Sequence, residues 1–195
     1  MKRLAVVAMC VLLTGCAEQS LIDDPTSPST SAPATDADSG SQAFVFDSGV
    51  LEIGDFDPYA LGDDLFDPCT EITAEEFAAA GFDNVEPIPE EYAGLARGLS
   101  VCQPAEEDNP SFIGNNADQP HIAETTGLLE YKSSVLPSLF TYGPKGGTGS
   151  GCFAQVDTQR GGLVAAVGGI DGFDIQADTC KTAISAIESI FLASQ

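Results

Sequence analysis

The first sixteen residues constrain the fold of the chain more than any other feature. Lys2 and Arg3 precede an apolar run over residues 4–13, and the small residues Thr14 and Gly15 follow it. A basic start, a short apolar run and small residues before a cleavage site are typical of a secretory signal peptide. The apolar run is too short to cross a bilayer core of roughly 30 Å as a helix. We therefore expect the remaining chain to fold outside the cytoplasm.

The run Leu13-Thr14-Gly15-Cys16 resembles the lipobox of bacterial lipoproteins. This resemblance implies cleavage just before Cys16 and a diacylglyceryl thioether on its sulfur. Two acyl chains are enough for stable residence in a membrane, whereas one chain is marginal. The predicted location is the extracytoplasmic face of the cell membrane, with the lipid anchor as the contact to that membrane.

Composition then divides the chain into three parts. Residues 1–15 form the signal peptide. Residues 16–43, with the lipidated Cys16 at their start, are rich in Ser, Thr, Ala, Pro and Asp. A segment with so little apolar surface cannot offset its ordering entropy, so we expect a disordered tether. Residues 44–195 are long enough for a single domain.

The charge of the chain limits its partners. The formal charge is −23, and it becomes −25 when the signal peptide leaves with Lys2 and Arg3. Such a chain is repelled by phosphate backbones and anionic lipid surfaces, so nucleic acid is excluded as a partner. Cationic proteins, cations and ligands held by apolar contacts remain possible partners. Alternatively, the negative charge only keeps an exported protein soluble.

Four cysteines remain besides Cys10 in the signal peptide and Cys16: Cys69, Cys102, Cys152 and Cys180. An even number in an oxidising compartment predicts two disulfides. No C-x-x-C spacing occurs, so neither zinc nor redox chemistry is indicated. Four cysteines allow three pairings; we favour Cys69–Cys102 and Cys152–Cys180, which close loops of about 30 residues. In the chain-entropy model each such bond contributes roughly 3.5 kcal/mol.

Two helices are predicted from their ends. Thr73-Ala74-Glu75-Glu76 forms a capping box, Ile72 and Phe77 occupy the staple positions, and Gly81 ends the helix. Near the C-terminus, Asp178 or Thr179 is expected to cap a helix whose apolar face comprises Ala183, Ile184, Ile187, Ile190, Phe191 and Leu192.

The strands are predicted from alternation and turn residues. Residues 152–157 and 163–167 flank a Gly-containing turn and indicate a hairpin. Shorter strands are expected at 44–46, 50–53, 99–103 and 136–142. Residues 104–120 are expected to form a loop, and 121–131 a strand followed by a helical turn. The predicted fold is α+β, a small mostly antiparallel sheet flanked by two helices and held by two disulfides.

No motif for catalysis, a cofactor or a metal is present. The glycine-rich run at 143–151 lacks the spacing of a phosphate loop or a nucleophile elbow. Asp55 and Asp57 begin a calcium-like spacing, but Tyr59 stands where the third ligand belongs. His121, the only histidine, is expected in a loop, and a surface or structural role is favoured over a Ser-His-Asp site. We therefore expect no enzyme, no cofactor and no specific metal site.

The arrangement of these parts resembles the actinobacterial lipoproteins of domain-of-unknown-function family 3558. The residues that carry the resemblance are the lipobox, Asp67-Pro68-Cys69 before a capped helix, Cys102 in a strand, and Cys152 and Cys180 near the end. The chain departs from the family pattern at Pro104, where a Trp often stands. The resemblance implies a secreted, membrane-anchored α+β domain and no activity.

The expected function is a non-catalytic, membrane-anchored lipoprotein that serves as a binding or interaction module of the cell envelope. Its partner is then a cell-envelope protein. The alternative is a carrier of a lipid or another apolar small molecule, which needs an apolar cavity of about 300 Å³ or more. A hydrolase is the least favoured alternative.

Replacing Cys16 tests the predicted anchor. Cys16→Ala removes the sulfur that accepts the lipid, so the protein should appear in the medium or stay as uncleaved precursor. Membrane fractionation with intact-mass measurement checks this. Unchanged membrane retention and processing of the variant would contradict the lipobox interpretation.

Overall fold

Two long neighbouring strands form the centre of the fold, β8 (Cys152–Thr158) and β9 (Gly161–Val167). The computed structural model describes residues 42–95, 99–105, 110–144, 150–169 and 175–195. The two strands pair antiparallel from Cys152↔Val167 to Thr158↔Gly161, which confirms the predicted hairpin. The turn is shorter than expected, because Gly161 adopts a φ of 96° that closes the hairpin within two residues.

The hairpin lies inside a seven-stranded antiparallel sheet with the order β3-β4-β5-β9-β8-β7-β6. The predicted mostly antiparallel sheet is thus confirmed. Both edge strands are only two residues long, which leaves little exposed backbone for edge-to-edge pairing. The other strands of this sheet are β3 (Glu86–Pro87), β4 (Val101–Gln103), β5 (Ser111–Asn115), β6 (Leu128–Leu129) and β7 (Phe140–Tyr142).

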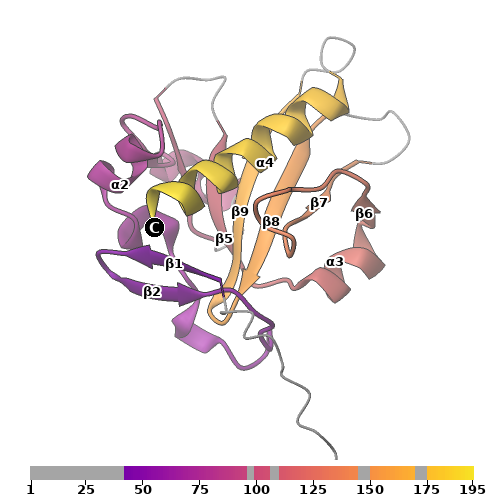
Figure 1. Cartoon of the computed structure of the whole chain (residues 1–195), viewed down its shortest axis with the longest axis horizontal. Coiled ribbons are helices and arrows are strands. Elements are labelled where there is room, and N and C mark those ends of the chain that lie inside the picture. Colours follow the sequence, from indigo (N-terminus) through magenta and orange to yellow (C-terminus); the bar gives the residue numbers. More distant parts are fainter. Residues whose placement is uncertain (1–41, 96–98, 106–109, 145–149, 170–174) are drawn as a thin grey trace, which may run out of the picture. The chain divides into compact units, whose positions relative to one another are not determined.

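One long helix, α4 (Gln176–Ala193), lies across one face of this sheet over β8 and β9 (Figure 1). Its predicted apolar face is buried, and Ile187 and Ile190 are almost fully inaccessible. Burying side chains of this size stabilises the fold by about 1.5 to 3 kcal/mol each. The Cys152–Cys180 disulfide joins the start of β8 to the first turns of α4, as predicted.

Two details of α4 differ from the prediction. The helix begins at Gln176 after Ile175 and has no side-chain cap, so the expected caps Asp178 and Thr179 are wrong. Thr179 instead donates its hydroxyl to the backbone oxygens of Ser150 and Gln176. Leu192 is 61% exposed and therefore does not belong to the buried face.

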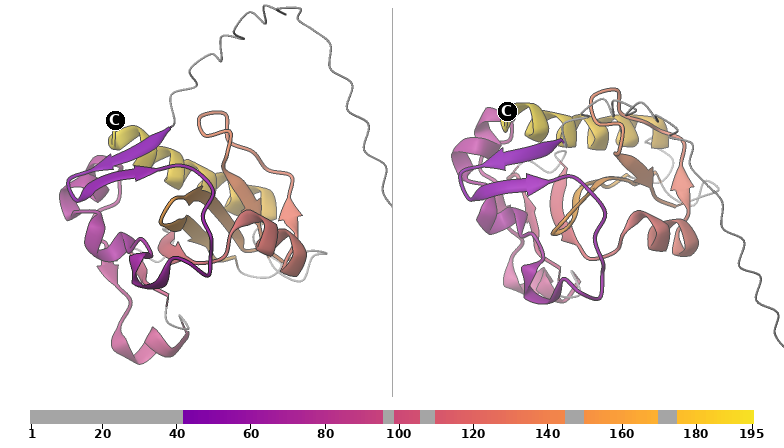
Figure 2. Two further views of the ribbon diagram at one scale, coloured as in Figure 1. Left: turned by 90° about the horizontal axis from the view of Figure 1, so that it is seen from below. Right: turned by 60° about the horizontal axis from the view of Figure 1, so that its bottom comes forward.

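A separate two-stranded hairpin, β1 (Ala43–Phe46) and β2 (Gly49–Glu52), packs beside the C-terminal part of α4 (Figures 1 and 2). Both strands were expected. The ring of Phe44 meets that of Phe191 edge to face, with centroids 5.5 Å apart. An isolated bridge between Ile53 and Thr158 connects this hairpin to the end of β8. The hairpin therefore closes the core at this end of the molecule.

The short helix α2 (Ala74–Ala79) has the local structure that its sequence predicts. Thr73 and Glu76 form the complete capping box, and Gly81 follows the helix with a φ of 93°. Phe77 is buried and packs on Phe112 of β5, with ring centroids 5.1 Å apart. The capped helix thus delivers one large aromatic side chain to the core.

The described part of the chain has four α-helices rather than the two predicted, because two short ones were missed. These are α1 (Pro68–Glu71), capped by Asp67, and α3 (Gln119–Thr125), capped by Asp118. Two short 3-10 helices, η1 (Gly62–Asp64) and η2 (Glu90–Leu95), complete the described elements.

The expected loop at 104–120 is wrong in its second half, because Ser111–Asn115 forms the inner strand β5. Pairing with β9 stabilises β5. The local sequence Ser-Phe-Ile-Gly-Asn does not by itself predict a strand. At 121–131 the expected order is reversed. Helix α3 comes first and strand β6 follows, since Asp118 caps the helix and Pro120 suits its first turn.

The N-terminal part lies outside the described residues. The signal peptide, Cys16 and almost all of the predicted tether fall within residues 1–41. In the described part of the chain, no helix is both long and apolar enough to cross a membrane.

Gly114 lets the segment before α1 lie directly on β5. A Cβ atom at this position would stand 2.1 Å from the backbone oxygen of Phe66 and 3.4 Å from Cδ of Pro68. Only a residue without a side chain allows this contact, so Gly114 fixes how closely α1 and Cys69 approach the sheet.

We expect Gly114→Ala to lower the free energy of unfolding by about 1 to 3 kcal/mol, as overpacking does elsewhere. Gly168→Ala is the matched control, because its added Cβ meets nothing within 4 Å. Chemical denaturation of both variants is the measurement. Equal stability of the two variants would contradict the close approach at Gly114.

Candidate binding groove and cysteine cluster

Three cationic side chains lie in the described part of this acidic chain: Lys132, Arg160 and Lys181. Arg160 is held in ion pairs. Its Nη1 lies 2.6 Å from Oε2 of Glu71 and its Nε lies 3.2 Å from Oδ1 of Asp64. The hydrogen bond to Glu71 raises the pKa of the guanidinium. Arg160 therefore has a structural role, since it fastens the β8–β9 turn to α1 and η1.

The other two cations line one surface hollow of about 380 Å³ between α4 and residues 131–134. On the helix side it is formed by residues spaced three or four apart, which places them on one stripe. We call this hollow the α4 groove. Its lining residues are Tyr131, Lys132, Ser134, Ala177, Lys181, Ile184, Ser185 and Glu188.

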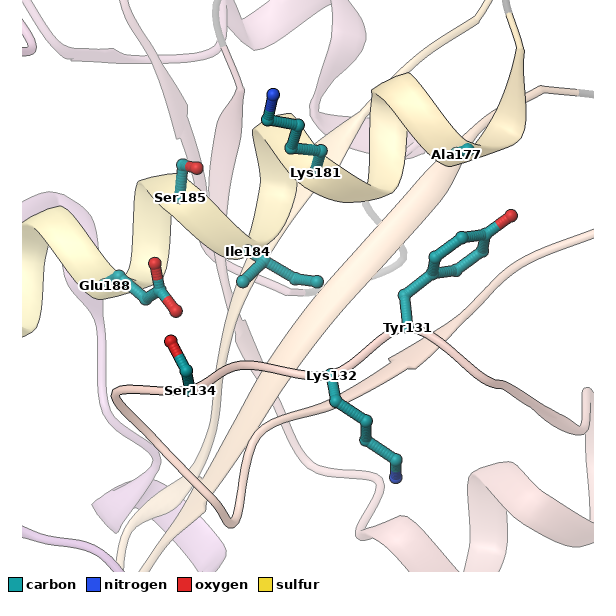
Figure 3. Close-up of a pocket in the computed structure, with 8 residues that line it drawn as sticks. All are labelled: Tyr131, Lys132, Ser134, Ala177, Lys181, Ile184, Ser185 and Glu188. Carbon is teal, nitrogen blue, oxygen red and sulfur yellow. The ribbon is translucent and has the colours of Figure 1, made fainter.

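Figure 3 shows how these side chains lie. Ile184 and the ring of Tyr131 lie between the helix and the facing segment, and Glu188 faces Ser134 at one end. Lys132 and Lys181 extend outward on opposite sides, so their ammonium groups mark the rims of the groove rather than its centre. The groove thus has apolar surface within and positive charge along two edges.

Hydrogen bonds fix the wall that faces α4. Ser133 donates its hydroxyl to Oε1 of Glu188 at 2.6 Å and accepts from the amides of Val135 and Leu136. At the other end, Thr141 donates its hydroxyl to the backbone oxygen of Tyr131. The groove is therefore held open by contacts that do not involve its lysines.

The two lysines stay unpaired within the described part of the chain. No carboxylate there lies within 4.0 Å of either ammonium group, while Glu188 is engaged by Ser133. In a chain with a formal charge of −23, these are two cationic groups without an ion-pair partner at one groove, which Glu188 also lines. Such a site attracts a negatively charged group over about 8 to 10 Å at moderate salt.

The four cysteines differ in their state. Cys152 and Cys180 form the predicted disulfide, whereas Cys69 and Cys102 are thiols. The second predicted disulfide is thus not formed in the structure, although each of the two thiols shifts the pKa of the other. The Cys152–Cys180 bond also eliminates the two alternative pairings of Cys69 and Cys102.

The thiol pair belongs to a small polar cluster at the start of α1. Asp67 Oδ1 accepts from the amide of Cys69 at 2.9 Å and from the hydroxyl of Ser100. The same hydroxyl lies 3.1 Å from the sulfur of Cys69. We call these residues, Asp67, Cys69, Ser100 and Cys102, the cysteine cluster.

A second polar cluster, which sequence reasoning missed, lies on the sheet face opposite α4. Gln155 is fully buried and bonds to Asn115, Tyr142 and Asp157 at 2.7 to 3.1 Å. Burial raises the pKa of Asp157 and of Tyr142. Asp157 also accepts from the amide of Gln119 at the start of α3. The polar groups of this cluster form hydrogen bonds with one another, so we assign the cluster a structural role.

His121 lies on α3 and not in the loop expected for it. It is exposed and lines a hollow of about 360 Å³ together with Asp57, Tyr59 and Asp118. Among the described residues, no three His, Cys, Asp or Glu side chains are grouped closely enough to hold a metal ion.

The comparisons with known proteins identify the family. A family model described as a protein of unknown function (DUF3558) matches residues 11–191. The chain belongs to this family. No curated protein and no solved structure matches the chain. The match confirms the family drawn from the sequence, whereas the lipobox and the cysteine pattern stay predictions.

The cysteine cluster makes a prediction about pH. Burial opposes ionisation of Asp67, but hydrogen bonds from Ser100, Cys69 and Thr70 outweigh it, so the pKa of this carboxyl is lowered. A carboxyl whose pKa is lower in the folded chain stabilises the fold above about pH 4. This contribution is lost as the pH falls through the folded pKa.

We expect Asp67→Ala to lower the free energy of unfolding by about 1 kcal/mol near neutral pH, through loss of the α1 cap. The difference from the unmodified protein should shrink as the pH falls below about 4. Denaturation at a series of pH values measures it. A difference that stays constant down to about pH 2 would contradict the charged cap.

Proposed function

We propose that the chain is an extracytoplasmic lipoprotein, anchored by lipid on Cys16, whose domain is a non-catalytic binding module of the cell envelope. The basic start, short apolar run and Leu-Thr-Gly-Cys sequence support the anchor.

The binding surface in this proposal is the α4 groove. The observation that carries it is the position of Lys132 and Lys181, which line one groove without an ion-pair partner in the described part of the chain. Ile184 and Tyr131 add apolar surface between them. The partner that fits is a cell-envelope protein with a segment that presents carboxylates beside an apolar side chain.

The overall charge restricts how that partner binds. A chain with a formal charge of −23 repels a polyanion at long range, so the acidic segment of the partner must be short. Close contact with the two lysines then gives specificity more than affinity, and the complex should weaken as salt increases.

The shape of the described hollows favours this module over a carrier of apolar molecules. Their volumes, from about 360 to 520 Å³, would admit a small ligand, but they open to solvent and mix polar with apolar walls. Beneath α4, the space against the sheet is filled by Ala183, Ile187 and Ile190.

We also propose that Cys69 and Cys102 join in the exported protein. The influence of each thiol on the pKa of the other, and the oxidising compartment expected for an exported protein, support this bond. It would connect α1 to β4, whereas the Cys152–Cys180 bond connects α4 to β8.

Crosslinking in living cells tests the binding surface. A photoreactive amino acid at Ser185, inside the groove, should capture a discrete envelope protein. The same amino acid at Thr182, which is exposed on α4 outside the groove lining, is the matched control and should capture it poorly. The captured band should be lost in Lys132→Gln/Lys181→Gln and kept in Lys132→Arg/Lys181→Arg.

Two results would contradict the proposal. One is equal capture from Ser185 and Thr182, which would show that the groove is not distinguished from the rest of the helix. The other is capture that persists unchanged in the double glutamine variant, which would show that the two lysines do not contribute to binding of the partner.

A further inference from the structure

The two cysteine pairs differ in their access to solvent. Cys152 on β8 and Cys180 on α4 are both fully buried. Cys102 is fully buried as well, on β4 against the backbone of Phe112, with its sulfur 3.8 Å from that carbonyl oxygen. Cys69 alone is partly exposed, in the first turn of α1. Cys69 is therefore the one residue of these four with surface exposed to solution.

The neighbours of Cys69 favour its thiolate form. The neighbouring Cys102 thiol lowers the pKa of Cys69 most, and the Ser100 hydroxyl, 3.1 Å from its sulfur, lowers it further, in spite of burial and the nearby Asp67 carboxylate. The same contact, together with burial, raises the pKa of Cys102. The pair is thus asymmetric, with a reactive outer sulfur and a protonated inner one.

We propose that Cys69 and Cys102 are a redox-active pair that exchanges with external thiols and disulfides. In this pair, Cys69 is the sulfur that meets the external molecule, and Cys102 is the resolving sulfur. The inference rests on the proposed contact of these two residues in the exported protein and goes beyond the binding function of the α4 groove.

The exchange balances in two steps. The Cys69 thiolate attacks one sulfur of an external disulfide RSSR; a Cys69–SR bond forms, and RS⁻ leaves with the electron pair. Cys102 then attacks the Cys69 sulfur, which expels the second RS⁻, and the proton of Cys102 passes to this leaving thiolate, which departs as RSH. The protein dithiol is oxidised by two electrons to Cys69–Cys102, and RSSR is reduced to two thiols.

In the reverse reaction, an external thiolate attacks only one of the two sulfurs. An external thiolate reaches Cys69 but not Cys102, so it attacks Cys69 and Cys102 becomes the leaving group. The Cys152–Cys180 bond offers neither sulfur to solvent and should stay intact. Exchange is therefore confined to the bond between α1 and β4, away from the helix that forms the groove.

Oxidised glutathione is a suitable probe for the full-length mature protein. In Cys102→Ala, the resolving sulfur is gone, so Cys69 should accumulate one glutathione per chain. In Cys69→Ala, only the buried thiol remains, and the adduct should form at least about tenfold more slowly. Intact-mass measurement follows both variants, and circular dichroism reports whether each is folded. Cys102→Ser is the second variant if the alanine variant unfolds.

Graded reduced glutathione on the unmodified protein completes the test. Alkylation and peptide mapping should show Cys69 and Cys102 opening together while Cys152–Cys180 remains joined. Adduct formation at equal rates in the two variants, or no adduct in either, would overturn the proposal. So would opening of both disulfides at the same reductant concentration.

These results separate the exchange from the proposed pairing. If mapping finds Cys69 joined to Cys102 but glutathione opens that bond no more easily than the other, the pairing stands and the exchange is wrong. If Cys69 and Cys102 are unjoined in the exported protein and oxidised glutathione then joins them to each other, the exchange stands and the structural crosslink is wrong.

Discussion

The packing of α4 on β8 and β9 is the interaction on which the rest of the structure depends. One stripe of Ala and Ile side chains on the helix fills the space over the two central strands. The Cys152–Cys180 bond fastens the start of this contact. At the far end, Phe191 receives Phe44 from the separate hairpin, so that β1 and β2 join the same core. Without α4, the apolar face of the sheet would be exposed to water.

The same helix carries the candidate binding surface on its flank. Residues that face the sheet are apolar, whereas Lys181, Ser185 and Glu188 lie at the edge, where the segment 131–134 meets the helix. Glu188 and Ser133 bond across that edge and set the width of the groove. A rigid core thus positions two lysines that the chain does not neutralise internally, which is how a strongly acidic domain can present a local site for a carboxylate.

Much of the fold follows from local patterns in the sequence. The capping box at Thr73 and Glu76, the central hairpin and the apolar stripe of α4 are all short-range features, and the structure has them. Strand β5 was missed because its stability comes from pairing with β9, some fifty residues later, and not from its own alternation. The groove was missed for a similar reason. Lys132 and Lys181 meet only when α4 docks, and nothing near either residue marks it as a binding residue.

The proposed lipid anchor and the α4 groove have separate tasks in one molecule. The N-terminal segment is expected to keep the domain at the membrane, and the domain then offers the groove to an envelope protein. The two lysines extend to opposite sides of the groove, and in the proposed complex the bound segment spans it and covers both of them. The most direct measurement is the rate at which a membrane-impermeant amine reagent modifies Lys132 and Lys181 in intact cells and in the purified protein. The account predicts slower modification of both lysines in cells; equal rates in the two samples would contradict it.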